Sequence, residues 1–309
     1  MIHQVFTCCQ NKLSLKNIVF VFCLLVQFEL SAQVKAVFEI TNESNRLDTP
    51  KSWKLVWHDE FDGNQLDVSK WFSYYPYTAS GLDTCPACRT LGGDLVLMDS
   101  NLVISNGTLK IIGKKQKSSW YGKEYPYTSG NLFSKQGFLY GRFEIRCKLP
   151  SGYGMWPAFW TLGEGVLEEI DVFEINGRYM RQFQTNYHHC YEAHNNCQDP
   201  KWHLSPALHE GFNVFAIEWD PFFIRWYVNN KLVRTLAGYE SSSSNRRIKS
   251  YKLKPGIYNQ VEHFPKTKAR IIAGLGIDSN KHGKLLKSKL FPAVFEIDYI
   301  RIYETQAKE

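Results

Sequence analysis

The segment EIDVFE at residues 169–174 places three carboxylates within a run of apolar, strand-forming residues. Side chains alternate between the two faces of a strand, so Glu169 and Asp171 point the same way. Strict alternation would send Glu174 to the opposite face, but one extra residue at positions 172–173, a β-bulge, would return it. Three carboxylates on one face repel one another and should raise at least one pKa. The segment therefore predicts a bulged strand in an active site that uses paired carboxylates.

The chain on both sides of this strand predicts an all-β fold. Short runs of alternating apolar and polar residues recur between turn signals from Trp53 onward, and helical periodicity is nearly absent. Asn229-Asn230 is a hairpin turn signal between two such runs. The runs cover residues 101–105, 108–112, 141–149, 213–219, 224–228, 232–236, 270–275 and 295–303. This spacing indicates one antiparallel β-sandwich or jelly-roll domain, and 309 residues, 44% of them hydrophobic, suffice for its core.

Five further motifs, in order along the chain, carry a resemblance to a known family. They are LVWHDEFDG at 55–63, YTSG at 127–130, YGRFE at 140–144, WPAFW at 156–160 and IDYIRIY at 297–303. With residues 169–174 they resemble glycoside hydrolase family 16, in the bulged form typical of laminarinases, agarases, carrageenases and porphyranases. The resemblance covers residues 53–304. It implies an antiparallel, concanavalin A-like jelly roll with a concave substrate cleft.

The resemblance also implies the chemistry. Glu169 would be the nucleophile, Glu174 the general acid/base, and Asp171 the residue that orients the nucleophile and modulates its proton balance. Such an enzyme cleaves internal β-glycosidic bonds with retention and needs no cofactor for the chemistry. Spacing alone does not show this, because five residues of extended strand span about 13–16 Å. Retention needs carboxyl groups about 5–5.5 Å apart.

Aromatic and polar side chains near this strand are candidates for substrate binding. Trp156 and Trp160 lie four residues apart and share a strand face, so they either floor the cleft against sugar rings or pack in the core. Trp202 lies in a predicted loop, where it either contacts the substrate or packs within the loop. Asn186 and His188 share a face on the following strand, which favours His188 over the histidine after it as a neighbour of the acid/base.

One residue of the closing motif suggests a metal. Asp298 matches a position that helps to bind a structural calcium ion in many family members. Calcium needs several oxygen ligands, including backbone carbonyls that a sequence does not reveal. A structural calcium ion is therefore an expectation of the resemblance.

The cysteines indicate an oxidising compartment. Three of the eight lie in the first 32 residues, and Cys147 shares a face with apolar residues, which predicts a buried free thiol. Cys85 with Cys88 and Cys190 with Cys197 would form two local disulfides, although cross-pairing between the two loops is equally allowed. A zinc site at Cys190 and Cys197 with nearby histidines is the alternative, but the spacing of a zinc finger is not met.

The first 32 residues have the pattern of a signal peptide. Lys12 and Lys16 precede an apolar run at 18–28, and Leu-Ser-Ala at 30–32 suits cleavage. The run is too short to span a bilayer. We therefore expect a secreted, periplasmic or cell-surface protein without stable membrane insertion, a linker at 33–50 and a catalytic domain at 51–305. We also expect a monomer.

Charge bears on the substrate. The chain has a formal net charge of +7, and its basic residues concentrate after residue 245. They form either a solvated basic face or a field that steers a polyanion such as a sulfated polysaccharide. No recognition helix or finger spacing supports binding to nucleic acid.

Glu168 stands directly before the acidic strand, where laminarinases of the family usually have glycine. This departure, the basic residues and the cysteine-bearing loops favour an algal galactan, sulfated or not, as the substrate. A neutral β-1,3-glucan, cleaved by a laminarinase, is the alternative. A transglycosylase and a non-catalytic sugar-binding module are further alternatives on the same fold, and the presence of all three carboxylates argues against the module.

Overall fold

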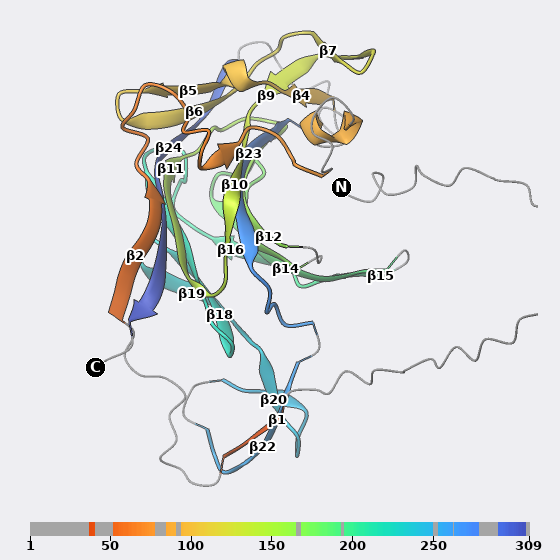
Figure 1. The fold of residues 1–309 in the computed structure, drawn as a ribbon, viewed down its shortest axis with the longest axis vertical. Coiled ribbons are helices and arrows are strands. Elements are labelled where there is room, and N and C mark those ends of the chain that lie inside the picture. Colours follow the sequence, from red (N-terminus) through yellow and green to blue (C-terminus); the bar gives the residue numbers. More distant parts are fainter. Residues whose placement is uncertain are drawn as a thin grey trace, which may run out of the picture.

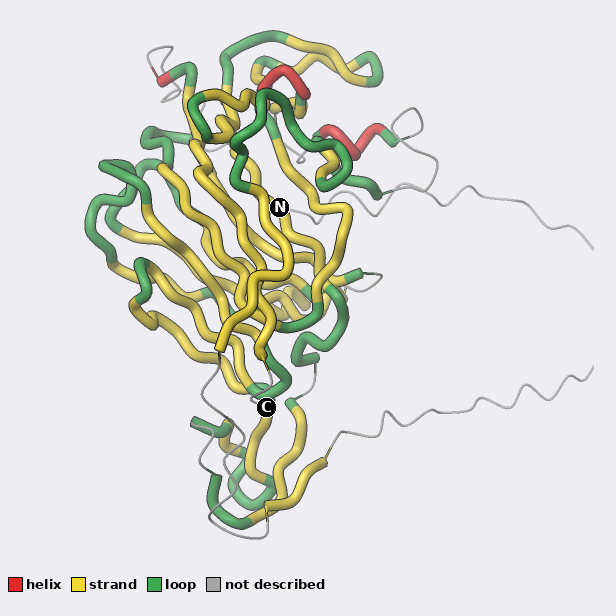
Figure 2. Tube along the Cα trace, turned by 60° about the vertical axis from the view of Figure 1, so that its left-hand side comes forward, coloured by secondary structure: helices red, strands yellow, loops and turns green. Residues whose placement is uncertain are grey.

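The computed structural model describes residues 37–40, 52–77, 85–90, 94–164, 168–192, 195–249, 253–261, 263–277 and 290–306. Strands dominate this part of the chain, and helix is confined to short 3₁₀ segments such as η2 (Pro86–Arg89) and η3 (Asp99–Asn101) (Figure 2). All eight runs of the predicted strand pattern fall on strands. The all-β fold is confirmed.

Two antiparallel sheets form the sandwich (Figure 1). The first, here called the carboxylate sheet, has the order β15 (Asn195–Gln198), β14 (Gln182–Glu192), β13 (Glu169–Glu174), β12 (Met155–Gly163), β23 (Ala269–Ile277), β10 (Asn131–Phe138) and β3 (Trp71–Phe72), with β16 (Lys201–Leu204) also paired to β14. The second, the backing sheet, has the order β19 (Lys231–Ala237), β18 (Phe223–Val228), β17 (Asn213–Trp219), β11 (Gly141–Lys148), β24 (Ala293–Gln306), β6 (Thr108–Gly113) and β5 (Leu102–Ser105), with β2 (Ser52–Asp59) on β24.

The core lies between the two sheets. Phe173 of β13 packs on Phe215 of β17, with ring centroids 4.3 Å apart, and on Phe159 and Phe295 at 6.5 and 6.3 Å. All four side chains are fully buried. Burying each ring stabilises the fold by about 1.5–3 kcal/mol. The apolar residues of the acidic strand therefore anchor one of its faces in the core.

The hairpin between β18 and β19 follows from its turn sequence. Asn229 and Asn230 have φ angles of 48° and 63°, the left-handed pair that a two-residue type I′ turn requires. Asparagine tolerates this conformation better than other residues with a side chain. The predicted hairpin is confirmed.

Smaller sheets lie at the two ends of the sandwich. At one end β4 (Leu95–Leu97) pairs with β9 (Tyr127–Ser129), and β7 (Ser118–Trp120) with β8 (Lys123–Tyr125). At the other end a four-stranded sheet has the order β1 (Val37–Ile40), β22 (Gly256–Gln260), β20 (Tyr239–Ser241) and β21 (Arg246–Arg247) (Figure 1).

Strand β1 corrects part of the predicted linker. Residues 37–40 are extended and pair antiparallel with β22, so this part of 33–50 is not irregular. The sequence VFEI is rich in β-branched and aromatic residues, which are enriched in strands. The rest of that segment and the predicted signal peptide at 1–32 lie outside the described residues. Within the described residues, the structure contains no helix of the length and apolarity needed to cross a membrane.

The cysteines follow the predicted local pattern where the structure describes them. Cys85 and Cys88 form a disulfide, which excludes cross-pairing of these two residues with the second loop. Cys147 is a buried free thiol, as predicted. Cys197 is disulfide-bonded, so it is not the thiolate that a zinc site would need. Its register partner across β14 and β15 is Cys190, whose side chain lies outside the described part of the chain.

Candidate active site

A bulge in β13 brings the three carboxylates to one face of the carboxylate sheet. Against β12, Asp171 is opposite Trp160 while Phe173 is opposite Phe159, so Val172 is the extra residue. Against β14, the register shifts between Asp171 and Glu174. Residues directly opposite in an antiparallel pair share a face. The predicted bulge is confirmed.

Three rows of paired residues define this face. Glu169 lies between Leu162 and His188, Asp171 between Trp160 and Asn186, and Glu174 between Ala158 and Gln184. The parity argument that placed Asn186 and His188 beside the carboxylates therefore holds. The face combines acidic, amide, imidazole and indole groups on a rigid sheet.

Asp171 is the most deeply buried of the three carboxylates. Its exposed fraction is 2%, against 7% for Glu169, and Glu174 is half-buried. Burial, with a further contribution from the negative charge of Glu174, raises the pKa of Asp171 well above its usual range. Asp171 also shares a hydrogen bond with Glu169. That hydrogen bond opposes the rise in the pKa, because it favours the ionised form of Asp171.

Asn186 is hydrogen-bonded to His188. Asn186 Oδ1 accepts a hydrogen bond from the Tyr187 backbone N–H at 2.9 Å, which fixes the orientation of the amide. Its Nδ2 then donates to His188 Nε2 at 2.8 Å and to Gln198 Oε1 at 3.2 Å. His188 Nε2 lies 3.3 Å from Asp171 Oδ2 and 3.6 Å from Glu169 Oε1.

The backing sheet holds the acidic strand from behind. Trp226 donates its indole N–H to the Asp171 carbonyl at 2.8 Å. Arg234, 5% exposed, lies 4.5 Å over the Trp226 ring and donates to the Thr185 carbonyl and hydroxyl, each at 3.0 Å. Its charge opposes the rise in the pKa of Asp171. The sequence analysis did not single out Arg234; its position in a run of alternating apolar residues is the only signal.

Trp156 contacts one of the carboxylates directly. Its indole N–H donates to Glu174 Oε1 at 2.9 Å. This bond occupies one oxygen of Glu174 and leaves the other for a ligand. Trp156 is thus a polar partner of Glu174 as well as a ring surface.

A model of the family described as Glycosyl hydrolases family 16 matches residues 94–269, more than half of the chain and all of the face just described. The chain belongs to glycoside hydrolase family 16. It is 29% identical over 278 residues to a β-glucanase from Rhodothermus marinus, a match that covers 84% of this chain and 88% of that protein.

Two further comparisons fit family 16. The glucan endo-1,3-beta-glucosidase A1 of Niallia circulans is 26% identical over 82% of this chain, which spans only 38% of that longer protein. The catalytic domain of an endo-1,3-beta-glucanase (laminarinase) from Thermotoga petrophila RKU-1 superposes with a TM-score of 0.66 at 27% identity, covering 84% of this chain and 100% of that domain. The predicted jelly-roll sandwich of the family is confirmed.

Trp160 does not have the open position expected of it in a family 16 cleft. It is 9% exposed and is covered by Tyr75, whose ring centroid is 6.3 Å away. Tyr75 in turn stacks on Tyr77 at 5.3 Å and 6°. Tyr77 is 45% exposed, so this tyrosine, and not Trp160, presents the open ring of the stack. The aromatic run YYPY at 74–77 is the sequence signal that could have pointed to it.

Trp202 lies on the other side of the carboxylates. It belongs to strand β16, where a loop was expected, and is opposite Gln184, which is itself opposite Glu174. Its side chain is 49% exposed, which a buried packing role does not explain. Trp202 is thus placed on the same face as Glu174, two strands away.

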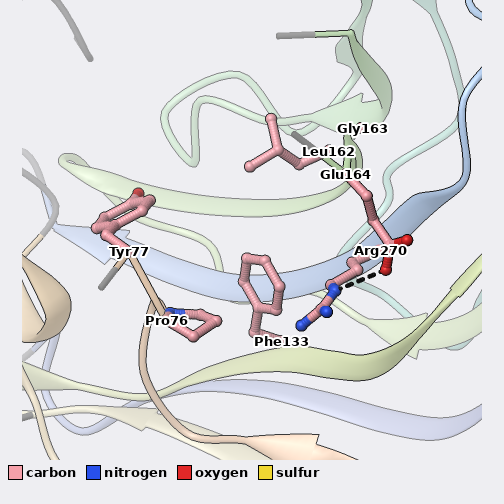
Figure 3. Close-up of a pocket in the computed structure, with 7 residues that line it drawn as sticks. All are labelled: Pro76, Tyr77, Phe133, Leu162, Gly163, Glu164 and Arg270. Carbon is pink, nitrogen blue, oxygen red and sulfur yellow. Dashed lines mark hydrogen bonds and ion pairs between the residues drawn. The ribbon is translucent and has the colours of Figure 1, made fainter. Parts of the chain in front are cut away.

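A pocket adjoins Glu169 at the opposite end of the face (Figure 3). It has a volume of about 260 Å³ and is lined by Pro76, Tyr77, Phe133, Leu162, Gly163, Glu164 and Arg270. Leu162 is the register partner of both Glu169 and Arg270, so the pocket continues the face that carries the three carboxylates. Burial and the negative charge of Glu169 raise the pKa of Tyr77, which places its hydroxyl within the field of that carboxylate.

Glu168, the departure from the laminarinase pattern, has a structural role. One of its carboxylate oxygens accepts hydrogen bonds from the backbone N–H groups of Lys266 and Thr267, both at 3.1 Å, and from the Thr267 hydroxyl at 2.7 Å. It directly precedes β13, and its hydrogen bonds point it at residues 266–267. Glu168 therefore holds the turn before β23 and does not line the face that carries the three carboxylates.

Asp298 does not fit the calcium site expected from the resemblance. Its carboxylate is paired with the guanidinium of Arg146. A cation in this position opposes a second cation and occupies an oxygen that calcium would need. Among the described His, Cys, Asp and Glu residues, the only cluster with metal-ligand geometry is Glu169, Asp171 and His188, on the face that carries the three carboxylates.

Proposed function

We propose that the protein is a retaining endo-β-1,3-glucanase whose chemistry is carried out by Glu169 and Glu174. The observation that carries the proposal is the placement of three carboxylates on one face by the bulge at Val172. Family membership gives the class of reaction, hydrolysis of a β-glycan within the chain. A protonated carboxyl beside an ionised one is the condition that a two-carboxylate mechanism requires.

In the first step Glu169 attacks the anomeric carbon while the glycosidic bond breaks. Glu174 gives its proton to the departing oxygen. In the second step Glu174 takes a proton from water, which attacks the same carbon and releases Glu169. Two displacements at one carbon restore its configuration, so the product keeps the β-anomeric form.

The neighbours of the two glutamates suit these roles. Asp171 shares a hydrogen bond with Glu169, which orients the nucleophile and lets a proton shift between the two carboxyl groups as the negative charge of Glu169 is consumed and restored. The Trp156 N–H holds Glu174 Oε1, so the other oxygen of Glu174 can exchange the proton with the substrate. The His188 ring borders both Glu169 and Asp171 and is hydrogen-bonded to Asn186 through Nε2.

A β-1,3-glucan is the substrate that these observations favour over a galactan. The relatives with a β-glucanase or laminarinase name support it. Glu168, one ground for the galactan prediction, holds the turn before β23, and Arg270 of the basic group is paired with Glu164. Trp202, beyond Glu174, is placed to stack on sugar units of the leaving chain.

Release of reducing ends from a panel of laminarin, agarose, porphyran and carrageenans tests the substrate. We expect laminarin to be cleaved, with oligosaccharides as early products, because the chain is cut internally. Cleavage of agarose or porphyran but not laminarin would establish the galactan alternative. Longer products than the starting oligosaccharide would indicate a transglycosylase, and binding without cleavage of any polysaccharide would indicate a sugar-binding module.

A further inference from the structure

The pocket beside Glu169 contains a charge pair that the two-step reaction does not use. Arg270 Nε donates to Glu164 Oε1 at 3.0 Å across the pocket rim (Figure 3). The rest of the lining is apolar or aromatic: Pro76, Tyr77, Phe133, Leu162 and Gly163. We propose that this pocket is a subsite for an uncharged sugar unit and that Glu164, by neutralising Arg270, makes it reject a sulfated one. The proposal rests on the proposed function, since it concerns the substrate of the same site.

The position of the pocket makes it part of the substrate path. Glu169, Leu162 and Arg270 are consecutive register partners on β13, β12 and β23. Neighbouring strands are about 4.8 Å apart, so Arg270 lies roughly 10 Å from Glu169 across the sheet. That distance is about two sugar rings from the attacked carbon. A unit of the glycan on the nucleophile side of the cleavage point therefore reaches the pocket.

The lining suits a neutral hexose. The Tyr77 ring is 45% exposed and rests on Tyr75, so it offers a supported face to the C–H side of a sugar. Phe133 and Leu162 supply apolar surface, and the Tyr77 hydroxyl and the charge pair supply hydrogen bonds to hydroxyl groups. A mostly apolar lining with a small number of polar groups is the usual composition of a small-molecule binding site.

The position of Glu164 is built into the fold. Its backbone N–H donates to the Lys268 carbonyl at 2.7 Å. Its carboxylate lies against Gly137, where an added Cβ would be 2.5 Å from Glu164 Oε1. Glycine at this position therefore makes room for the carboxylate. Glu164 is held in the place where it blocks Arg270 from an incoming anion.

The charges around the pocket do not favour an anionic sugar. Arg270 is the only cation among the lining residues, and Glu164 cancels it. The ionised nucleophile Glu169 adds negative charge on the same face. The exposed Lys266 and Lys268 belong to the preceding turn and do not line the pocket. An ester sulfate at this site would be repelled by the negative charge of Glu169. Repulsion between like charges is a common way to exclude a wrong binding partner.

The test compares two substrates that share one backbone, laminarin and chemically sulfated laminarin. For wild type we expect kcat/KM on the sulfated form to be lower by about 10-fold or more, given like-charge repulsion at a partly exposed site. In Glu164→Gln, which keeps the shape but frees the Arg270 charge, the ratio of kcat/KM on laminarin to kcat/KM on sulfated laminarin should shrink by several-fold. Glu304→Gln, at an exposed position on β24, removes the same charge elsewhere and should leave the ratio unchanged.

The proposal that Glu164 makes the pocket reject a sulfated sugar would be overturned by either of two results. One is an unchanged substrate ratio in Glu164→Gln, and the other is an equal change of that ratio in Glu304→Gln. Failure of wild type to cleave laminarin would instead contradict the proposed function. In that case the same ratio is measured between the native and desulfated forms of whichever galactan is cleaved. Calorimetric binding of neutral and sulfated laminari-oligosaccharides to Glu174→Gln gives the answer without hydrolysis.

Discussion

Hydrolysis of laminarin is expected to fall by roughly 1,000-fold or more when either Glu169 or Glu174 is replaced by Gln. Glutamine keeps the size of the side chain but neither attacks an anomeric carbon nor exchanges a proton at neutral pH. Glu174→Gln can still accept from the Trp156 N–H, so the local geometry survives. Initial rates of reducing-end release measure the effect, and circular dichroism and the thermal unfolding midpoint show that the variants are folded.

The two variants should differ on a substrate with an activated leaving group. An aryl β-glycoside whose phenol leaves readily needs little protonation, so Glu174→Gln should still form the glycosyl-enzyme and release a burst of phenol. Glu169→Gln should give no burst, because the attacking oxygen is lost. Glu304→Gln serves as the control and should retain normal turnover. Near-normal turnover of laminarin in either active-site variant would remove the assignment of β13 as the catalytic strand.

Asp171→Asn is expected to lower activity and raise stability at the same time. Activity should fall by about 10-fold or more, because asparagine still donates a hydrogen bond to Glu169 but cannot pass a proton. Stability should rise, because asparagine mimics the protonated form that burial imposes on Asp171. Active-site residues commonly show this opposition between function and stability.

The stability gain of Asp171→Asn should depend on pH in one direction. The folded-state pKa of Asp171 lies above its unfolded value, so the stability that its proton provides is complete below about pH 4 and is lost as pH rises toward the folded pKa. The free energies of unfolding of wild type and variant should therefore agree near pH 4. At neutral pH the variant should be the more stable of the two proteins. Urea unfolding across this range measures it, and a variant less stable than wild type at pH 7 would contradict a protonated Asp171.

The sequence predicted those features that depend on local alternation. Period-two spacing within β13 placed Glu169 and Asp171 together, and the need to return Glu174 to that face located the bulge. The same period-two alternation favoured His188 over the next histidine, because His188 shares a strand face with Asn186. These predictions succeed because neighbouring strands in register must present opposite residues on a common face.

Contacts between distant segments escaped the sequence analysis. Tyr75 covers Trp160 only because the segment after β3 folds over β12, which alternation within either segment does not reveal. Arg234 of the backing sheet contacts Thr185 of β14, the strand beside the acidic strand, and its own strand looked like any other alternating run. Glu168 suggested a different substrate because its partners at 266–267 lie almost 100 residues away in the sequence. Pairing of β1 with β22 is likewise a long-range contact.

The anomeric form of the first product tests the central claim most directly. Wild-type protein is mixed with laminari-oligosaccharides in deuterated buffer, and the anomeric protons of the new reducing ends are followed by NMR from the first minutes. Hydrolysis through a glycosyl-Glu169 intermediate predicts that the β-anomer appears first and that the α-anomer grows only with mutarotation. An α-anomer in the earliest spectra would show a single displacement by water and would contradict the account.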